Sequence, residues 1–191
     1  MNNPVRVLKK LFGLAPRSRG RPRPCAFRVK LQIFLYFYIM SDNFKIKNKE
    51  KSYYLTLTTV GWVDIFTRVN HKLLIANSLQ YCIKNKGLVI FAYCIMPSHV
   101  HLICRAEGIQ NLSEILRDFK GYTSKKIIKQ VQEEPESRRE WLLEYFSKAC
   151  SHLKRKQKHK VWQDSNHAKE IISTSFLYEK LEYIHNNPVQ D

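Results

Sequence analysis

The stretch "CIMPSHVHLIC", residues 94–104, places His99 and His101 on either side of Val100 within an apolar run. Successive side chains of a strand point to opposite faces, so both histidines would share one face of a sheet. Two imidazoles on a half-buried surface are costly unless something uses them. The spacing leaves two interpretations open: a pair of solvent-facing histidines on an edge strand, or two ligands of a metal ion, since histidine is the commonest metal ligand.

A second polar pair lies near the C-terminus, where "STSFLYEKLEYIHNN" predicts a helix that Pro188 ends. Tyr183 and Asn187 are four residues apart and therefore share one face of that helix. This face is displaced from the core stripe, which consists of Leu177, Leu181 and Ile184. Two histidines, a tyrosine and an amide oxygen on a basic protein are the parts for metal-assisted phosphoryl transfer by a phenolate nucleophile.

The elements that must position these groups follow from hydrophobic periodicity. The segment "YYLTLTTVGWVDIFT", residues 53–67, predicts a strand followed by a loop, and residues 70–87 predict a helix that ends at Gly87. "LVIFAYCIM", residues 88–96, predicts a buried strand. Its expected antiparallel neighbour in a tight hairpin is "SHVHLICRA", residues 98–106.

A second amphipathic helix is predicted over residues 111–132, with an apolar side formed by Leu112, Ile115, Leu116 and Phe119. Its outer side would supply phosphate contacts whose affinity falls with salt. These basic residues are Arg117, Lys120, Lys125, Lys126 and Lys129. The run "KRKQKHK", residues 154–160, is either a solvated loop or a further set of phosphate contacts.

The rest of the chain completes the expected fold. Residues 133–160 are interpreted as an insertion with one helix around residues 141–149, and residues 161–171 predict a short strand and a loop. The order of elements indicates an α+β fold: a single ferredoxin-like antiparallel sheet with helices packed on one face.

The formal net charge of +17 points to an anionic partner, with nucleic acid as the first candidate. Residues 1–40 carry nine of the 33 basic side chains and no acidic one, so the remaining 24 basic and 16 acidic residues still leave a net charge of about +8. We expect residues 1–40 to be an extension outside the fold, with Met40 as an alternative start; a membrane-surface role for this segment stays open. Its apolar run, residues 31–40, is too short to span a bilayer, and five cysteines without a CxxC pair fit a reducing compartment.

Four separated motifs give the chain a specific resemblance over roughly residues 50–189. They are "MPSHVHL" at 96–102, "DFKGYTSKK" at 118–126, "VWQ" at 161–163 and "LEYIHNNPV" at 181–189. In these motifs and their order the chain resembles the single-tyrosine HUH transposases of the REP-associated kind, which are IS200-like transposases.

The resemblance implies a ferredoxin-like fold, a homodimer, and single-stranded or hairpin DNA as the partner, in the bacterial cytoplasm at the nucleoid. It implies that Tyr183 cleaves and rejoins single-stranded DNA through a 5′-phosphotyrosine intermediate, with His99, His101 and Asn187 as ligands of Mg²⁺ or Mn²⁺. Imidazole is an unusual ligand for Mg²⁺, so Mn²⁺ suits the histidines better. No glycine-rich phosphate loop is present, and no nucleotide cofactor is expected. Residues 41–191 would form the transposase domain, and we interpret the end of the chain at Asp191 as a C-terminal truncation.

Other assignments stay open. The chain could be a catalytically inactive, truncated transposon-derived DNA-binding protein, or a histidine-dependent RNA phosphoesterase, although that class would want two separated His-x-Thr/Ser motifs. Tyr122 is a second candidate nucleophile, and Asp118 or Asp164 could add a carboxylate near a metal. The remaining histidines are interpreted as surface residues: His71, His152, His159, His167 and His185. Trp62 and Trp162 are interpreted as core residues in preference to base-stacking platforms.

Overall fold

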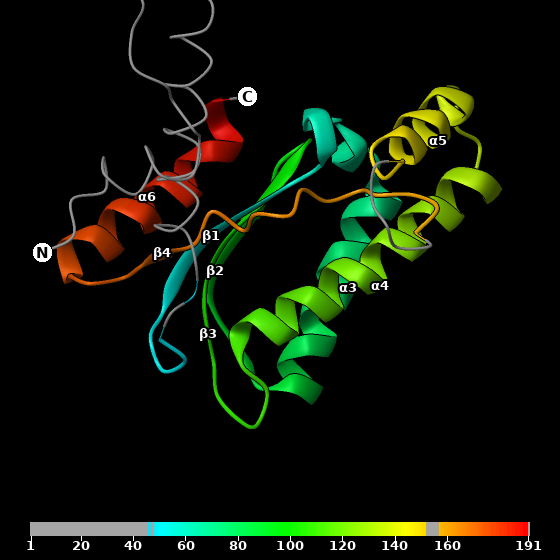
Figure 1. Cartoon of the computed structure of the whole chain (residues 1–191). Helices are drawn as coiled ribbons and strands as arrows, with labels where there is room; N and C mark the ends of the chain where they lie inside the picture. The colour runs from blue at the N-terminus through cyan, green and yellow to red at the C-terminus, as the bar shows by residue number, and fades with distance from the viewer. Residues whose placement is uncertain (1–45, 47, 152–156, 191) are drawn as a thin grey trace, which may run out of the picture. The chain divides into compact units, whose positions relative to one another are not determined.

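A computed structural model of the chain describes residues 46, 48–151 and 157–190. Within this range the α+β prediction is confirmed, because four helices accompany one antiparallel sheet of four strands with the order β2-β3-β1-β4 (Figure 1). The strands are β1 (Tyr53–Thr58), β2 (Leu88–Ile95), β3 (His99–Ala106) and β4 (Lys169–Glu170). The helices are α3 (Val69–Lys86), α4 (Leu112–Glu133), α5 (Arg139–Lys148) and α6 (Thr174–Gln190), and two short 3₁₀ turns, η1 (Val60–Trp62) and η2 (Ile65–Thr67), follow β1.

Residues 1–40, expected to be an extension, lie outside the described residues. Among the helices that are described, none combines the length and the apolarity that a membrane span needs.

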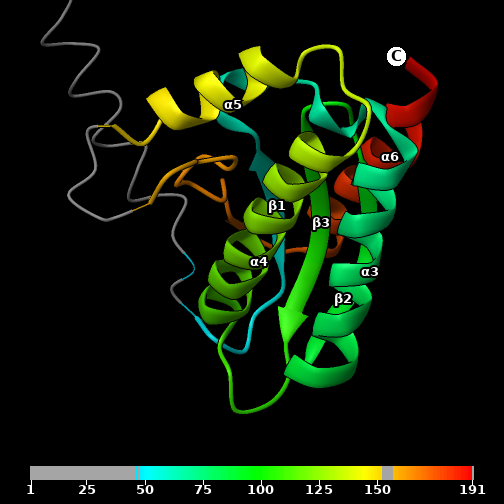
Figure 2. The same ribbon diagram turned by 90° about the vertical axis from the view of Figure 1, so that its right-hand side faces the viewer.

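The two faces of the sheet are covered by different helices. Val100, Leu102 and Cys104 of β3 belong to the main core beneath α3 and α4, while Ile103 belongs to a second cluster beneath α6. Figure 2 shows α3 and α4 in front of the strands and α6 behind them. The prediction that the helices pack on one face is therefore wrong for α6. The second face exists because β1 and β3 carry apolar side chains on both faces, and these need cover.

The strand β3 lies inside the sheet, between β2 and β1. This position excludes the interpretation of His99 and His101 as histidines on an edge strand. The strand β2, predicted as buried, is instead an edge strand whose Phe91 and Tyr93 are 51% and 52% exposed. The apolar sequence of β2 therefore does not mean that both faces of this strand are buried.

The helix ends follow local capping rules, with one exception. Asn111 caps α4 by accepting a hydrogen bond from the backbone N–H of Glu114, and the Glu114 carboxylate in turn accepts one from the backbone N–H of Asn111. The helix α6, however, does not end at Pro188 as predicted but continues to Gln190. The proline removes a single hydrogen bond, two residues before the helix ends, where the remaining carbonyls lack helical partners in any case.

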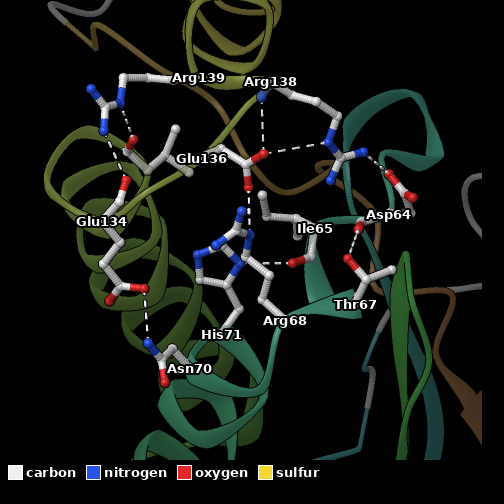
Figure 3. Close-up of polar contacts among 11 residues, drawn as sticks. Asp64, Ile65, Thr67, Arg68, Asn70, His71, Glu134, Glu136, Arg138 and Arg139 are labelled. Atoms are coloured by element: carbon white, nitrogen blue, oxygen red, sulfur yellow. Dashed lines mark hydrogen bonds and ion pairs between the residues drawn. The ribbon is translucent and has the colours of Figure 1, made fainter.

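The helix α5 belongs to the core, although its segment was interpreted as an insertion. Leu142 and Phe146 are fully buried in the main cluster. Before α5, polar contacts hold the turn at residues 134–139 in place (Figure 3). Glu136 pairs with Arg68 at 2.7 Å, and Arg138 pairs with Asp64 at 2.6 Å.

The same contact region, drawn in Figure 3, holds His71. Its side chain is 1% exposed, and its Nδ1 lies 2.7 Å from the carbonyl oxygen of Ile65. The prediction that His71 lies at the surface is therefore wrong. A buried imidazole needs a polar partner, and the 3₁₀ turn η2 supplies one. The contacts around His71 and Glu136 connect η2, the start of α3 and the turn before α5.

The end of α3 generates a stability prediction. Gly87 has φ of 70°, and a Cβ atom there would overlap the backbone carbonyl oxygen of Glu107. We expect Gly87→Ala to lower the free energy of unfolding by about 2 kcal/mol or more, because alanine is strained at positive φ.

The matched control is Gly121→Ala within α4, where an added Cβ would meet nothing within 4 Å. We expect this change to raise the free energy of unfolding by roughly 0.5–1 kcal/mol. Urea unfolding followed by circular dichroism measures both values, and equal effects of the same sign would contradict the account of the α3 end.

Candidate active site

The alternation of β3 places His99 and His101 on one face of the sheet, as the sequence predicted, and this face is the one that α6 covers. Their Nε2 atoms are 3.0 Å apart, and their rings meet edge to face with centroids 4.6 Å apart. His101 is 4% exposed, so it is a buried polar residue that must have partners. The two imidazoles therefore point their ε nitrogens at a common position.

The other ring nitrogen of each histidine faces a hydroxyl group. The Nδ1 of His101 lies 2.8 Å from the hydroxyl of Tyr54 and 3.1 Å from that of Thr56. The Nδ1 of His99 lies 3.1 Å from the hydroxyl of Ser98. Hydroxyl groups both donate and accept, so they can pair with an imidazole that carries its proton on Nδ1. That tautomer leaves the lone pair of Nε2 available to a ligand.

The register of the sheet explains these contacts. Thr56 pairs with His101 across the β1–β3 ladder, and Tyr54 pairs with Ile103. Residues two apart on one strand share a face, so Tyr54 and Thr56 both reach His101 from the neighbouring strand. The strand sequence "YYLTLT" thus supplies hydroxyls on the α6 face and leucines on the other.

Burial sets the protonation of the site. Burial first, and then the nearby charges of His99 and Lys180, lower the pKa of His101 to about 4. Burial likewise raises the pKa of Tyr54 to about 12, against the opposing hydrogen bond with Thr56 and with a further rise from Tyr183. At neutral pH His101 is therefore uncharged and Tyr54 keeps its proton. A neutral imidazole is the form that binds metals.

The donor set fits one divalent cation. Two ligands in neighbouring positions of an octahedral ion, each at about 2.1 Å, lie roughly 3.0 Å apart, and the two Nε2 atoms have that separation. No group of three or more His, Cys, Asp or Glu side chains suited to a metal occurs among the described residues. Further ligands would therefore come from neutral oxygens, from water or from a phosphate.

Asn187 was predicted as the third ligand. It lies in α6, one turn after Tyr183, with a half-buried side chain. Its Nδ2 is buried without a hydrogen-bond partner among the described residues. The two ends of a side-chain amide exchange places by a rotation of 180°, so the oxygen can take this position. A role as ligand stays a prediction.

Tyr183 projects from α6 toward the histidines. Its ring centroid lies 5.3 Å from that of His101 and 6.4 Å from that of Tyr54, both edge to face. The side chain is 47% exposed, so solvent and a large substrate can reach it. The helix is docked by Ile184, which is 2% exposed, with Leu177 and Leu181 packed beside it as the predicted stripe requires.

Lys180 is a member of the site that the sequence reasoning missed. Its ammonium lies 5.8 Å from the ring centroid of Tyr183 and 5.5 Å from that of Tyr54, and it pairs with Glu179 at 2.6 Å. Its position three residues before Tyr183 places both side chains on one helical face. The three-residue spacing between Lys180 and Tyr183 is the feature of the sequence that indicates this proximity.

The structure separates Tyr122 from the histidines. Tyr122 is 52% exposed on α4, which covers the face of the sheet opposite to α6. The two carboxylates considered for a metal are engaged elsewhere, since Asp118 pairs with Lys86 at 2.6 Å and Asp164 with Lys160 at 2.7 Å. None of these residues joins the site.

The remaining predictions about histidine and tryptophan residues are right for some residues and wrong for others. His167 and His185 are exposed and His159 is half-buried, while His152 lies outside the described residues. Trp162 is 3% exposed and belongs to the core as predicted. Trp62 is 60% exposed, so its assignment to the core is wrong.

The basic side of α4 lines a groove. Its volume is about 1150 Å³, and its lining includes Arg117, Lys125, Lys158 and Lys160. Arg117, Lys125, Lys126 and Lys129 are exposed as predicted. Lys120 is the exception, because its ammonium donates to the carbonyl oxygens of Gln163 and Ser165 at 2.8 and 3.1 Å, and burial lowers its pKa to about 8.

The comparisons with known proteins agree with this architecture. The family model described as "Transposase IS200 like" matches residues 51–161, more than half of the chain. The chain belongs to the IS200-like transposase family. No curated protein matches it.

Two solved structures are similar to the chain. One is a REP-associated tyrosine transposase bound to a REP hairpin, with a TM-score of 0.51, 18% identity, and coverage of 76% of this chain and 71% of that one. The other, described as "a putative transposase from deinococcus radiodurans r1", has a TM-score of 0.43 and 18% identity, and the match covers 74% of this chain and 94% of that one. At this identity the first likeness concerns the fold alone.

Proposed function

We propose that this chain cleaves and rejoins single-stranded DNA through a covalent bond to Tyr183. The observation that supports the proposal most strongly is the position of the Tyr183 ring, 5.3 Å from His101, whose Nε2 lies 3.0 Å from that of His99. A half-exposed phenol beside two converging imidazoles suits a nucleophile that acts on a large, flexible substrate. Membership of a transposase family directs the chemistry to DNA.

In the proposed step the phenolate oxygen of Tyr183 attacks a backbone phosphorus. The bond between phosphorus and the 3′ oxygen breaks, the 3′ oxygen leaves and takes up a proton, and a 5′-phosphotyrosine ester forms. A 3′-hydroxyl attacking this ester restores the phosphodiester and the phenol. The ester preserves the energy of the original bond, so rejoining needs no nucleotide cofactor.

His99 and His101 would hold a divalent cation, with Mg²⁺ or Mn²⁺ as candidates and Asn187 as a further ligand. The bound ion would polarise the scissile phosphate and offset developing negative charge. Tyr54 and Thr56 would orient His101, since partners of the distal ring nitrogen fix the orientation of a ligating imidazole. Lys180 places a positive charge beside the Tyr183 ring, where it would offset the negative charge of the attacked phosphate.

The DNA-binding part of the proposal rests on α4. Exposed Arg117, Lys125, Lys126 and Lys129 face away from the histidines, on the opposite side of the sheet. They would bind a part of the DNA distant from the cleaved phosphate. The structural neighbour bound to a REP hairpin supports single-stranded or hairpin DNA as the partner. A homodimer is part of the proposal, and light scattering should then give about twice the 22.7 kDa of one chain.

The basic side of α4 gives a prediction for binding. Changing Arg117, Lys125, Lys126 and Lys129 together to glutamine should flatten the salt dependence of binding to a single-stranded oligonucleotide. With about 0.7 counterions released per contact, the slope of log K against log salt should fall by up to roughly 3. Fluorescence anisotropy between 50 and 300 mM NaCl, about the range in which such slopes are measured, provides the values.

The matched control changes Lys72 and Lys84 of α3, both exposed, to glutamine. We expect the slope of this control to stay close to that of the unchanged chain. A quadruple variant with an unaltered slope would exclude α4 as the phosphate-binding surface.

The nucleophile gives the sharpest test of the proposed function. With Mn²⁺ and 5′- or 3′-labelled single-stranded oligonucleotides, including hairpins, we expect a covalent protein–DNA adduct. Tyr183→Phe removes one oxygen and little packing, and should abolish the adduct. Tyr122→Phe, on the opposite face, should retain it, and Lys180→Met should slow adduct formation because the site loses a positive charge near the attacked phosphate.

Peptide mapping of the trapped adduct assigns the tyrosine directly. DNA on the peptide that contains Tyr122, or an adduct with Tyr183→Phe, would contradict the assignment. DNA binding without any adduct from the unchanged chain would favour a catalytically inactive DNA-binding protein instead.

A further inference from the structure

Trp62 is held at the candidate site in a conformation that its own backbone disfavours. Its φ is 57°, in the left-handed region, and it follows Gly61 with φ of 61°. The side chain is 60% exposed, so hydrophobic burial does not offset the strain. Such outliers persist only where the surrounding structure determines them, and they gather at functional sites.

The surrounding structure does determine this turn. Thr59, at its start, donates its hydroxyl proton to the carbonyl oxygens of Val63 and Ser98 at 2.8 and 2.9 Å. The N–H of Val60 donates to Val161 at 2.8 Å. Ser98 directly precedes His99, so the turn and the histidine strand are joined next to the site.

A second support comes from α5. The Tyr145 side chain lies so close to Gly61 that a Cβ atom at position 61 would overlap its hydroxyl and ring. Trp141 stacks on Tyr145 with ring centroids 5.4 Å apart and is itself 48% exposed. The polar contacts in Figure 3 fix the turn that leads into α5. The backbone that carries the exposed Trp62 side chain is therefore held from two sides.

The position of Trp62 limits what it can bind. Its indole meets the His99 ring edge to face, with centroids 5.4 Å apart, and the rest of the indole faces solvent. A group bound there would lie beside the position at which the two Nε2 atoms converge. If a phosphate of a single-stranded nucleic acid lay at that position, its neighbouring base would be the flat group beside Trp62. Aromatic side chains stack on every base type.

We propose that Trp62 is a stacking platform for a nucleobase beside the cleaved phosphate, on a turn against which Tyr145 packs at Gly61. This inference rests on the proposed function, because it takes the substrate to be single-stranded DNA. An indole has only two side-chain torsions, so on a held backbone it loses little conformational entropy when it stacks, and it positions the strand at low cost. The stack would hold the backbone in place without reading its sequence.

The test compares two probes that share a backbone and differ in their bases. One is a 16-residue oligothymidine, and the other a 16-residue oligomer of abasic tetrahydrofuran sites, both of about the length of a single-strand binding site. The ratio of their dissociation constants measures the contribution of bases alone. A Tyr183→Phe background prevents cleavage during the measurement.

We expect Trp62→Leu, which keeps an apolar side chain without a π-face, to reduce this ratio by roughly 5- to 150-fold. Trp62→Phe should retain most of it, because it restores an aromatic face. Tyr81→Ala on α3, which removes an equally exposed aromatic residue from the opposite side of the sheet, should leave the ratio unchanged. Thermal melting checks that each variant folds, and the Leu and Phe variants are both apolar, whereas only Phe carries a π-face.

A ratio that stays within twofold in Trp62→Leu overturns the inference, as does an equal loss of affinity for both probes or the absence of binding to either. The two proposals fail separately. An adduct at Tyr183 together with an unchanged ratio removes the stacking platform and leaves the transesterase. A reduced ratio without any adduct from the unchanged chain supports the platform and removes the cleavage activity.

Discussion

The burial of His101 in the middle of the sheet is the constraint on which the site depends. An imidazole that is 4% exposed cannot stay without partners, and a strand can offer partners only from its neighbours or from a covering helix. The strand β1 provides Tyr54 and Thr56 in the required register. The ε nitrogen then points away from both hydroxyls toward His99, and the fold thus fixes both ring nitrogens before any ligand is present.

The helix α6 completes the site. Its apolar stripe covers the second face of the sheet, and the same docking brings Tyr183 and Lys180 to the histidines. Burial and positive charge work in one direction here, because both keep His101 neutral. A neutral His101 beside Lys180 therefore offers a lone pair and a positive field at one place, which suits the proposed attack on an anionic phosphate.

Much of this architecture could be predicted from the sequence, and the failures have physical causes. Period-two alternation placed His99 and His101 on one face, and helical periodicity placed Tyr183 off the apolar stripe; both predictions are confirmed. The face of the sheet that α6 covers could not be predicted. An apolar stripe indicates that a helix packs against the sheet, but it does not indicate which face the helix covers. The apolar residues Tyr54 and Ile103 on the second face were the overlooked signal.

Predictions about single residues failed for a related reason. Periodicity does not show which polar side chain finds a partner across the fold, so it missed the burial of His71 against Ile65 and the pairing of Lys120 with Gln163 and Ser165. The exposed Trp62 lies on a turn with two positive φ values in succession, and composition does not encode such a turn.

The central proposal, that His99 and His101 together would hold a divalent cation beside Tyr183, is tested most directly by electron paramagnetic resonance of the chain titrated with Mn²⁺. The account predicts one bound ion per chain with nuclear couplings from two histidine nitrogens, reduced to one in His99→Ala and in His101→Ala. Binding of Mn²⁺ without any histidine nitrogen coupling, or identical spectra for the unchanged chain and both variants, would contradict it.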